Sequence, residues 1–142
     1  MTGEHDLARF VRAQAGCYGQ ALAELQAGEK RSHWMWFVFP QILGLGLSEN
    51  ARLYAISGLG EADAYLRHEM LGARLRECTQ AMLGHAAERS ATAILGPIDT
   101  LKFKSSMTLF ERAAPDDEVF GQALEAFFDG ARDEATLAKL DA

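Results

Sequence analysis

The sequence predicts an all-α protein that folds as one domain over residues 4–141. Its 142 residues have the length of a single domain. Apolar residues recur mainly at three- and four-residue steps, the spacing of a buried helix face. No segment shows the convincing alternation of apolar and polar residues that is typical of strands. We therefore expect about seven helices, with an aromatic-rich insert after the first of them.

The first expected helix runs from Asp6 to Gln26, where apolar residues keep helical spacing, and it ends at Gly28. Pro40 stops the aromatic insert, because proline cannot continue a helix. Capping residues and apolar spacing place the later helices, in chain order, at 48–56, 61–67, 71–84, 99–113, 119–130 and 137–140, with a brief turn at 90–94. Ser48, Ser90 and Asp99 are the expected N-caps of the segments that they begin.

Composition limits the classes of function. The net charge is −6 and the isoelectric point is about 5.2, so we expect no non-specific binding to nucleic acid. Two short basic segments, Lys30-Arg31 and Lys102-Phe-Lys104, can still bind one small anion. Cys17 and Cys78 are far apart and lie at apolar helical positions, as expected for reduced core cysteines of a cytoplasmic protein.

The sequence also predicts several absences. The first residues lack the basic and apolar regions of a signal peptide, and no apolar run approaches the roughly 20 residues that span a bilayer. The histidines outside the aromatic insert, His5, His68 and His85, are too scattered to form a metal site. We therefore expect no membrane association, no metal and no cofactor.

The aromatic insert is the most informative segment. Six consecutive residues from Trp34 to Phe39 are apolar, and exposing them would cost about 1.5–3 kcal/mol for each large side chain. The run is therefore core, a pocket wall, or both. Polar residues flank it, namely Lys30, His33, Gln41 and Ser48. They are expected to frame a cleft with Trp34, Trp36 and Phe39 as its wall. A structural plug without a ligand is an equally good interpretation of this composition.

The glycines that follow the insert are weaker evidence. Gly44 and Gly46 precede the expected N-cap Ser48, and such a loop can present backbone N–H groups to a phosphate. The third glycine of a dinucleotide-binding loop and the lysine of a P-loop are absent. A tight turn is the favoured interpretation.

The second candidate segment is the helix expected from Asp99. Two lysines, one aspartate and the hydroxyls of Ser105, Ser106 and Thr108 lie within ten residues of a chain that is otherwise acidic. Lys102, Ser105 and Ser106 follow helical steps and are expected to share one face, and Thr108 lies on an adjacent stripe with Lys104. Such a face can bind a phosphate or a ribose phosphate. A solvated face is the alternative.

These observations lead to one main hypothesis and one alternative. The 30–48 segment and the 99–110 helix are expected to face each other across a cleft that binds a nucleotide, ADP-ribose or a sugar phosphate. If the protein is an enzyme, His33 is the expected proton carrier, together with Asp99. The alternative is a protein-interaction or homodimer module that uses the tryptophan-rich segment.

Several segments carry motifs of a known family, namely His33-Trp-Met-Trp36-Phe-Val-Phe-Pro40-Gln41, Gly44-Leu-Gly46-Leu-Ser48, Tyr54-Ala-Ile56, Glu61-Ala62 with Tyr65-Leu66, Leu71-Gly72-Ala-Arg74-Leu75, and Asp99-Thr-Leu-Lys102 with Ser105-Ser106-Met-Thr108-Leu-Phe110. Together they give the chain a resemblance to the bacterial family catalogued as domain of unknown function 1810. The resemblance extends from about Leu7 to Leu140 and implies a compact, mainly helical, soluble domain. No reaction is assigned to the family.

The chain is also similar, more distantly, to the NADAR proteins, small helical domains that act as N-glycosidases in ADP-ribose chemistry. That similarity implies a hydrolase acting on a phosphorylated nucleoside or an ADP-ribose derivative. The characteristic Glu-His-x-x-x-Gln-x-x-Lys pattern is not reproduced, because Glu4-His5 is not followed by its glutamine and lysine. The similarity is therefore an analogy.

Overall fold

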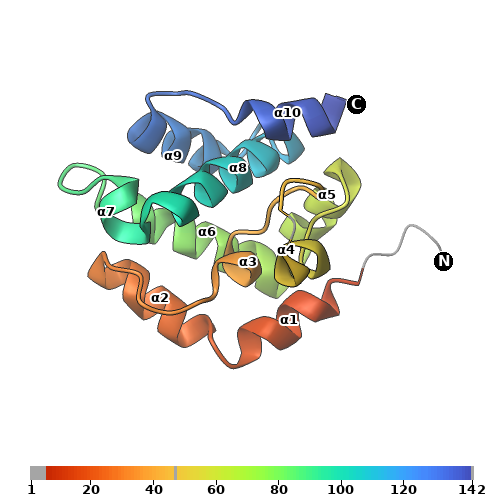
Figure 1. Ribbon diagram of the computed structural model, residues 1–142, viewed down its shortest axis with the longest axis horizontal. Coiled ribbons are helices and arrows are strands. Elements are labelled where there is room, and N and C mark those ends of the chain that lie inside the picture. The colour runs from red at the N-terminus through yellow and green to blue at the C-terminus, as the bar shows by residue number, and fades with distance from the viewer. Residues whose placement is uncertain (1–5, 47, 142) are drawn as a thin grey trace.

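The computed structural model describes residues 6–46 and 48–141, and this part of the chain is all-α, as predicted (Figure 1). The expected domain start at residue 4, the Glu4-His5 pair and Leu47 lie outside the described residues. The helices are α1 (Ala8–Ala15), α2 (Tyr18–Ala27), α3 (Met35–Val38), α4 (Glu49–Leu53), α5 (Leu59–Arg67), α6 (Glu69–Leu83), α7 (Ala91–Leu95), α8 (Pro97–Ala113), α9 (Glu118–Phe128) and α10 (Glu134–Asp141).

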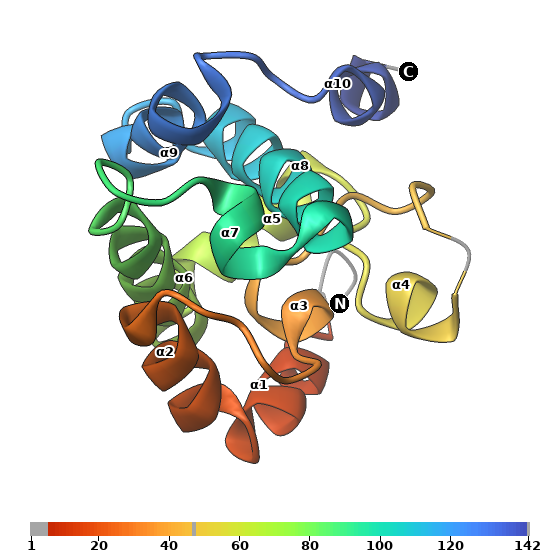
Figure 2. The ribbon, with the colours of Figure 1, turned by 60° about the vertical axis from the view of Figure 1, so that its left-hand side comes forward.

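Helix α8 organises the fold. It packs against α5, α7, α9 and α10, while α6 contacts α9 on one side and α1 and α2 on the other. Figures 1 and 2 show α9 and α10 on one side of α8, and α1 and α2 at the opposite end of the molecule. Phe103, Met107 and Phe110 of α8 are fully buried in the single core that these helices enclose.

The first predicted helix is interrupted. Instead of one helix over 6–26, α1 ends at Ala15 and α2 begins at Tyr18. Gly16 closes α1 and Cys17 leaves the helical region, with φ −139° and ψ −10°. The break lets both halves pack on α6, because a straight helix would carry one of them away from the core. This break, together with the short helices α3 and α7, raises the count from the seven expected to the ten that the described residues contain.

Two predicted caps are confirmed and one is wrong. The Ser48 and Ser90 hydroxyls accept hydrogen bonds from the backbone N–H groups of Ala51 and Ala93, which are 3.1 and 3.0 Å away. Asp99 is not an N-cap, because α8 already begins at Pro97, with Gly96 as the capping residue. Proline suits the first helical position, where its missing N–H and fixed φ cost nothing.

The corner between α5 and α6 is tightly packed. A Cβ added to Gly72 would lie 2.1 Å from the carbonyl oxygen of Leu66, far inside van der Waals contact. The absence of a side chain at this position allows the first turns of α6 to lie directly against the end of α5.

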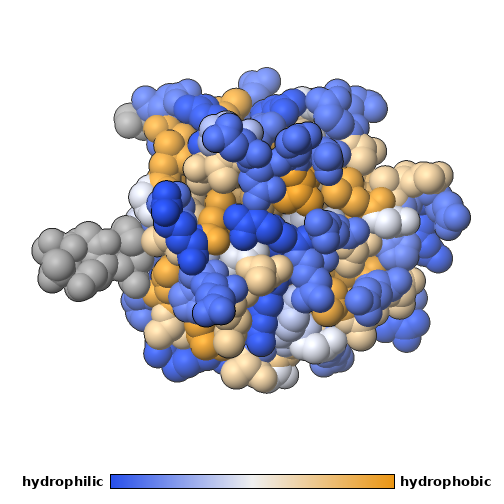
Figure 3. Space-filling view, turned by 180° about the vertical axis from the view of Figure 1, so that it is seen from behind, coloured by the Kyte–Doolittle hydropathy of each residue, from blue (hydrophilic) through white to orange (hydrophobic). Residues whose placement is uncertain are grey.

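The surface contains both hydrophilic and apolar side chains. On the face turned away from Figure 1, hydrophilic side chains dominate and apolar ones lie between them in narrow strips (Figure 3). None of the helices described is long and apolar enough to cross a membrane. The same part of the chain holds no cluster of histidine, cysteine and acidic side chains suited to a metal ion.

Candidate functional site

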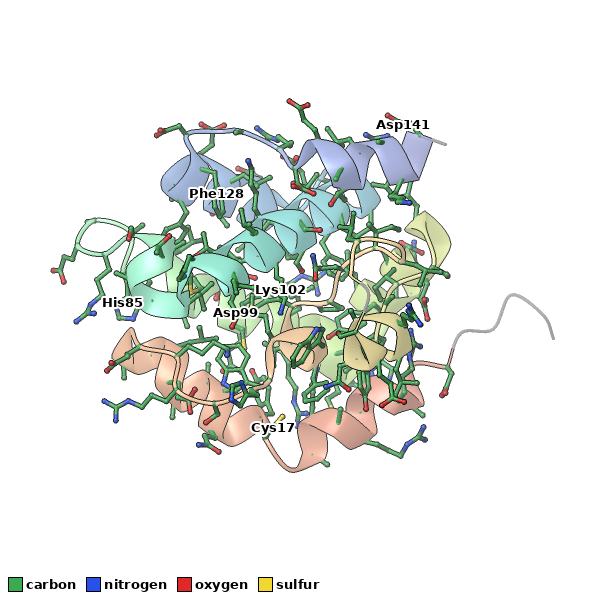
Figure 4. The ribbon with its side chains drawn as sticks, viewed as in Figure 1. Cys17, His85, Asp99, Lys102, Phe128 and Asp141 are labelled. Carbon is green, nitrogen blue, oxygen red and sulfur yellow. The ribbon has the colours of Figure 1, made fainter. Side chains whose placement is uncertain are left out.

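The structure brings the start of α8 and the loop between α2 and α3 together. Lys30 Nζ lies 2.9 Å from Oδ2 of Asp99, and Lys102 Nζ lies 3.3 Å from Oδ1 of the same carboxylate. Figure 4 shows Asp99 and Lys102 near the start of α8. We call Lys30, Asp99 and Lys102 the ion triad. Two ammonium groups share one carboxylate, so the triad carries a net positive charge in an acidic protein.

Aromatic rings support both lysines of the triad. The ammonium of Lys30 is 5.1 Å from the centroid of the Trp34 ring, and that of Lys102 is 4.5 Å from the Trp36 ring. At these distances the ring faces attract a cation. The Lys30 side chain is only 8% exposed. Its backbone N–H also donates to the carbonyl of Ile94, 2.8 Å away, which holds the loop against the end of α7.

A first pocket lies beside the triad and has a volume of about 280 Å³. We call it the lysine pocket; its walls are formed by Lys30, His33, Met35, Trp36, Leu95, Gly96, Pro97, Ile98, Asp99 and Lys102. The N-terminus of α8 opens into it, and Gly96 offers no side chain to cap that end. Uncapped N–H groups at a helix N-terminus favour a bound anion. The pocket therefore combines two cations, a positive helix end and the imidazole of His33.

A second pocket of about 430 Å³ adjoins the first. We call it the serine pocket; it is lined by Trp36, Gln41, Leu45, Gly46, Ser48, Ala51, Ile98, Leu101, Lys102, Ser105, Asp133 and Ala135. Trp36, Ile98 and Lys102 line both pockets and form the ridge between them. The two pockets therefore belong to one cleft between the 30–48 segment and α8, to which Ala51 of α4 and Asp133 and Ala135 at the start of α10 also contribute.

Four of the expected site residues do not reach these walls. Trp34 and Phe39 are fully buried, and the Phe39 ring packs edge-on against Phe103, with centroids 5.0 Å apart. Ser106 and Thr108 are also fully buried. Helix α8 has neighbours on several sides, so residues that follow Ser105 turn toward the core rather than the cleft.

The two buried hydroxyls of α8, those of Thr108 and Ser106, differ in their hydrogen bonds. The Thr108 hydroxyl donates to the carbonyl of Lys104, 2.8 Å away, and accepts from the backbone N–H of Asp133 at 2.9 Å. This pair of bonds ties α8 to the segment before α10. The Ser106 hydroxyl oxygen has no hydrogen-bond partner in the described part of the chain.

Glu24 is a positioning residue that the sequence analysis missed. Its carboxylate accepts hydrogen bonds from the backbone N–H groups of Arg31 and Ser32, at 2.8 and 3.0 Å, and from the Ser32 hydroxyl at 2.6 Å. The indole N–H of Trp34 donates to it at 2.9 Å. Together these bonds fix the loop that carries Lys30 and His33.

The environment of Glu24 keeps its carboxyl ionised. Burial alone would raise the pKa, but hydrogen bonds from Ser32, Arg31 and Trp34 outweigh it and lower the pKa of Glu24 to about 2. The signal was present in the sequence, because Glu24 lies between Ala21 and Leu25 on the apolar face of the helix expected over 6–26, the face that α2 buries. A carboxylate at such a position is rarely left without partners.

The fold and the cleft define a class of protein: a small all-helical domain with a positively charged pocket at a helix N-terminus. The chain belongs to the protein family of unknown function DUF1810, whose model matches residues 4–140.

The chain is also similar to a solved structure, the conserved hypothetical protein Rv1873 from Mycobacterium tuberculosis. The two share 50% sequence identity and a TM-score of 0.93, over 96% of this chain and 97% of that one. No curated protein matches. The comparisons establish the family and the fold.

Proposed function

We propose that this protein binds a small phosphorylated ligand, such as a nucleotide, ADP-ribose or a sugar phosphate, in the cleft between the 30–48 segment and α8. The ion triad is the observation that carries this proposal. Asp99 balances only one of the two ammonium groups, and each lysine has further N–H donors that an anion can use. A phosphate in the lysine pocket would complete the charge balance.

The burial of the triad strengthens the argument. An excess positive charge is costly where water is largely excluded, and the side chains of Lys30, Asp99 and Lys102 are only 8%, 18% and 23% exposed. A purely structural ion pair would match one cation with one anion. The unmatched cation next to the uncapped start of α8 is better explained by an anionic ligand, which both groups attract.

Trp36 supports the organic part of such a ligand. Unlike Trp34, it is only partly buried and lines both pockets. An exposed indole next to polar groups is a common platform for the apolar face of a sugar or a base. The volumes of the two pockets together fall in the range of about 300–1,000 Å³ that is typical of ligand sites.

A thermal-shift panel of nucleotides, ADP-ribose and sugar phosphates tests the proposal. A ligand at about 100 times its Kd stabilises the folded state by about 2.7 kcal/mol, which corresponds to a rise in Tm of roughly 5–10 °C for a domain of this size. Lys30→Gln and Lys102→Gln should abolish the rise. The matched control is Lys104→Gln, on the same helix but outside both pockets. The absence of any shift with millimolar phosphorylated ligands would overturn the proposal.

For catalysis, we propose His33 as the group that transfers a proton, with Asp99 as its partner in the lysine pocket. The reaction to test is hydrolysis of the N-glycosidic bond of a phosphorylated nucleoside or ADP-ribose derivative. Water adds to the anomeric carbon, and the base leaves with a proton. Chromatography detects the released base. His33→Gln should abolish release while the ligand-induced rise in Tm remains, and release unchanged in that variant would exclude this role.

An interaction module is the second candidate function. Ile98 and Leu101 line the cleft and are 70% and 65% exposed, which is unusual for large apolar side chains on one helix. A homodimer that covers them would depend on protein concentration. Light scattering with the native protein and with Trp36→Ala tests this function: a dimer lost in a folded variant favours it, and a monomer at all concentrations excludes self-association.

A further inference from the structure

The two pockets differ in charge and in hydrogen-bonding character, although they share the ridge of Trp36, Ile98 and Lys102. The lysine pocket contains both lysines of the triad and the start of α8. Ser105 and Asp133 line the serine pocket but not the lysine pocket, and we call this side of the cleft the far wall of the serine pocket. A phosphate would be attracted to the first and repelled by the carboxylate of the second. A phosphorylated ligand should therefore bind in one orientation, with its phosphate in the lysine pocket.

Hydrogen bonds already present determine what the far wall of the serine pocket can accept. The Thr136 hydroxyl donates to Oδ2 of Asp133 at 2.6 Å, so its single proton is used. The 2.7 Å bond between Ser105 and Thr136 must therefore be donated by Ser105. The wall is left with the lone pairs of Ser105 and the carboxylate of Asp133, which are acceptors. A ligand that fits it must bring donors, such as hydroxyl groups.

The residues at the ridge require the ligand to have an apolar face as well. The Trp36 ring is partly exposed, and the side chains of Ile98 and Leu101 project from α8 beside it. A ring with one apolar face and several hydroxyl groups satisfies the indole, the apolar side chains and the acceptor wall together. A sugar has this structure, whereas a lipid chain or a simple anion does not.

We infer that the ligand is a sugar phosphate ester that spans the ridge, with its phosphate in the lysine pocket and its sugar hydroxyls donating to Asp133 and Ser105. This inference rests on the proposed function and adds the ligand class and the direction of binding. The same chemistry occurs in a free sugar phosphate and in a nucleotide. In a nucleotide the base would lie over Ile98 and Leu101, whose exposed side chains it would cover.

Isothermal titration calorimetry with inorganic phosphate, ribose 5-phosphate and adenosine 5′-monophosphate tests the inference. Ribose 5-phosphate should bind at least about tenfold more tightly than phosphate, the effect of one or two hydrogen bonds to a charged acceptor. If adenosine 5′-monophosphate binds more tightly still, the sugar phosphate that the cleft recognises is part of a nucleotide. Equal affinity for the two sugar compounds identifies the free sugar phosphate.

Variants locate the two ends of the ligand. Asp133→Asn retains the cap on the Thr136 backbone N–H, which lies 3.0 Å from Oδ2, so we expect it to fold. It and Ser105→Ala should remove the advantage of ribose 5-phosphate and leave phosphate binding unchanged. Lys30→Gln should weaken both. Asp116→Asn, which changes the same charge outside the cleft, is the control.

The outcomes separate this inference from the function on which it rests. If no phosphorylated compound binds, the proposed function fails. If phosphate and ribose 5-phosphate bind equally well, or if Asp133→Asn and Ser105→Ala keep the full advantage of the sugar, phosphate binding stands and the sugar-directed binding mode is overturned.

Discussion

The Lys102 ammonium lies 4.5 Å from the centroid of the Trp36 ring and 3.3 Å from a carboxylate oxygen of Asp99. The side chain thus joins the aromatic insert to α8 at the ridge of the cleft. The same lysine lines both pockets, so it can respond to a ligand in either one.

The two tryptophans should behave differently when truncated. Trp34 is fully buried and donates to Glu24, so Trp34→Ala should destabilise the fold by about 3–5 kcal/mol. Trp36 is only partly buried, so Trp36→Ala should cost less stability and should weaken ligand binding. Urea unfolding and calorimetry measure the two effects. Equal losses of stability would contradict the assignment of Trp36 to the pocket wall.

Asp99 should compete with an anionic ligand for the lysines. Asp99→Asn removes the negative charge that both ammonium groups share, so phosphate should bind more tightly. The gain should shrink as salt is added, since ions screen the partly exposed Lys102. Titrations at low and high ionic strength check this. Weaker binding in the variant would show that Asp99 instead positions the lysines.

Glu24 should make the free energy of unfolding decrease as the pH is lowered. Its pKa is lowered from 4.5 to about 2 in the folded state, so its stabilising contribution is fully present above pH 4.5. The contribution is lost as pH falls from 4.5 toward 2, because the unfolded chain takes up the proton first. Urea unfolding of the native protein and of Glu24→Gln at several pH values isolates this group.

The variant itself should be less stable at neutral pH by about 1–3 kcal/mol, because an amide cannot satisfy all the donors that the carboxylate accepts. The stability difference between native and variant proteins should shrink across the acid range. A difference that does not change with pH would contradict the role assigned to the charge.

Gly96 should tolerate no side chain without strain. Its φ of +89° lies in a region that other residues rarely adopt, although an added Cβ would meet no atom within 4 Å. Gly96→Ala should therefore destabilise the fold by about 1–3 kcal/mol through the backbone alone. Gly19→Ala, in open space within α2, is the control and should leave stability equal or raise it by up to about 1 kcal/mol. Thermal unfolding compares the two variants.

The sequence predicted the helical class because the period of its apolar residues is a local property. The caps at Ser48 and Ser90 were predictable for the same reason, since a cap depends on a residue and its next few neighbours. The break at Gly16–Cys17 was not predictable. Glycine is tolerated in helices, and only the packing of α1 and α2 on α6 selects the break.

The candidate site likewise contains residues that their type alone identifies and residues whose place depends on the fold. Lys30, Asp99 and Lys102 were identified by their residue types, and the structure places them in contact. Trp34 could not be distinguished from Trp36 by composition, because burial depends on the position of Glu24 in another helix. Asp133 carried no local signal, since its place at the cleft comes from the packing of the segment before α10 against α8.

The close contact between Gly72 and the Leu66 carbonyl gives a useful tool for work in cells. Even alanine at position 72 would force α5 and α6 apart, and neither residue lines the lysine or the serine pocket. An allele with a bulkier residue there would remove the folded protein without altering the chemistry of the cleft. Comparing that allele with a Lys30 or Asp133 allele would separate phenotypes caused by losing the protein from phenotypes caused by losing its ligand.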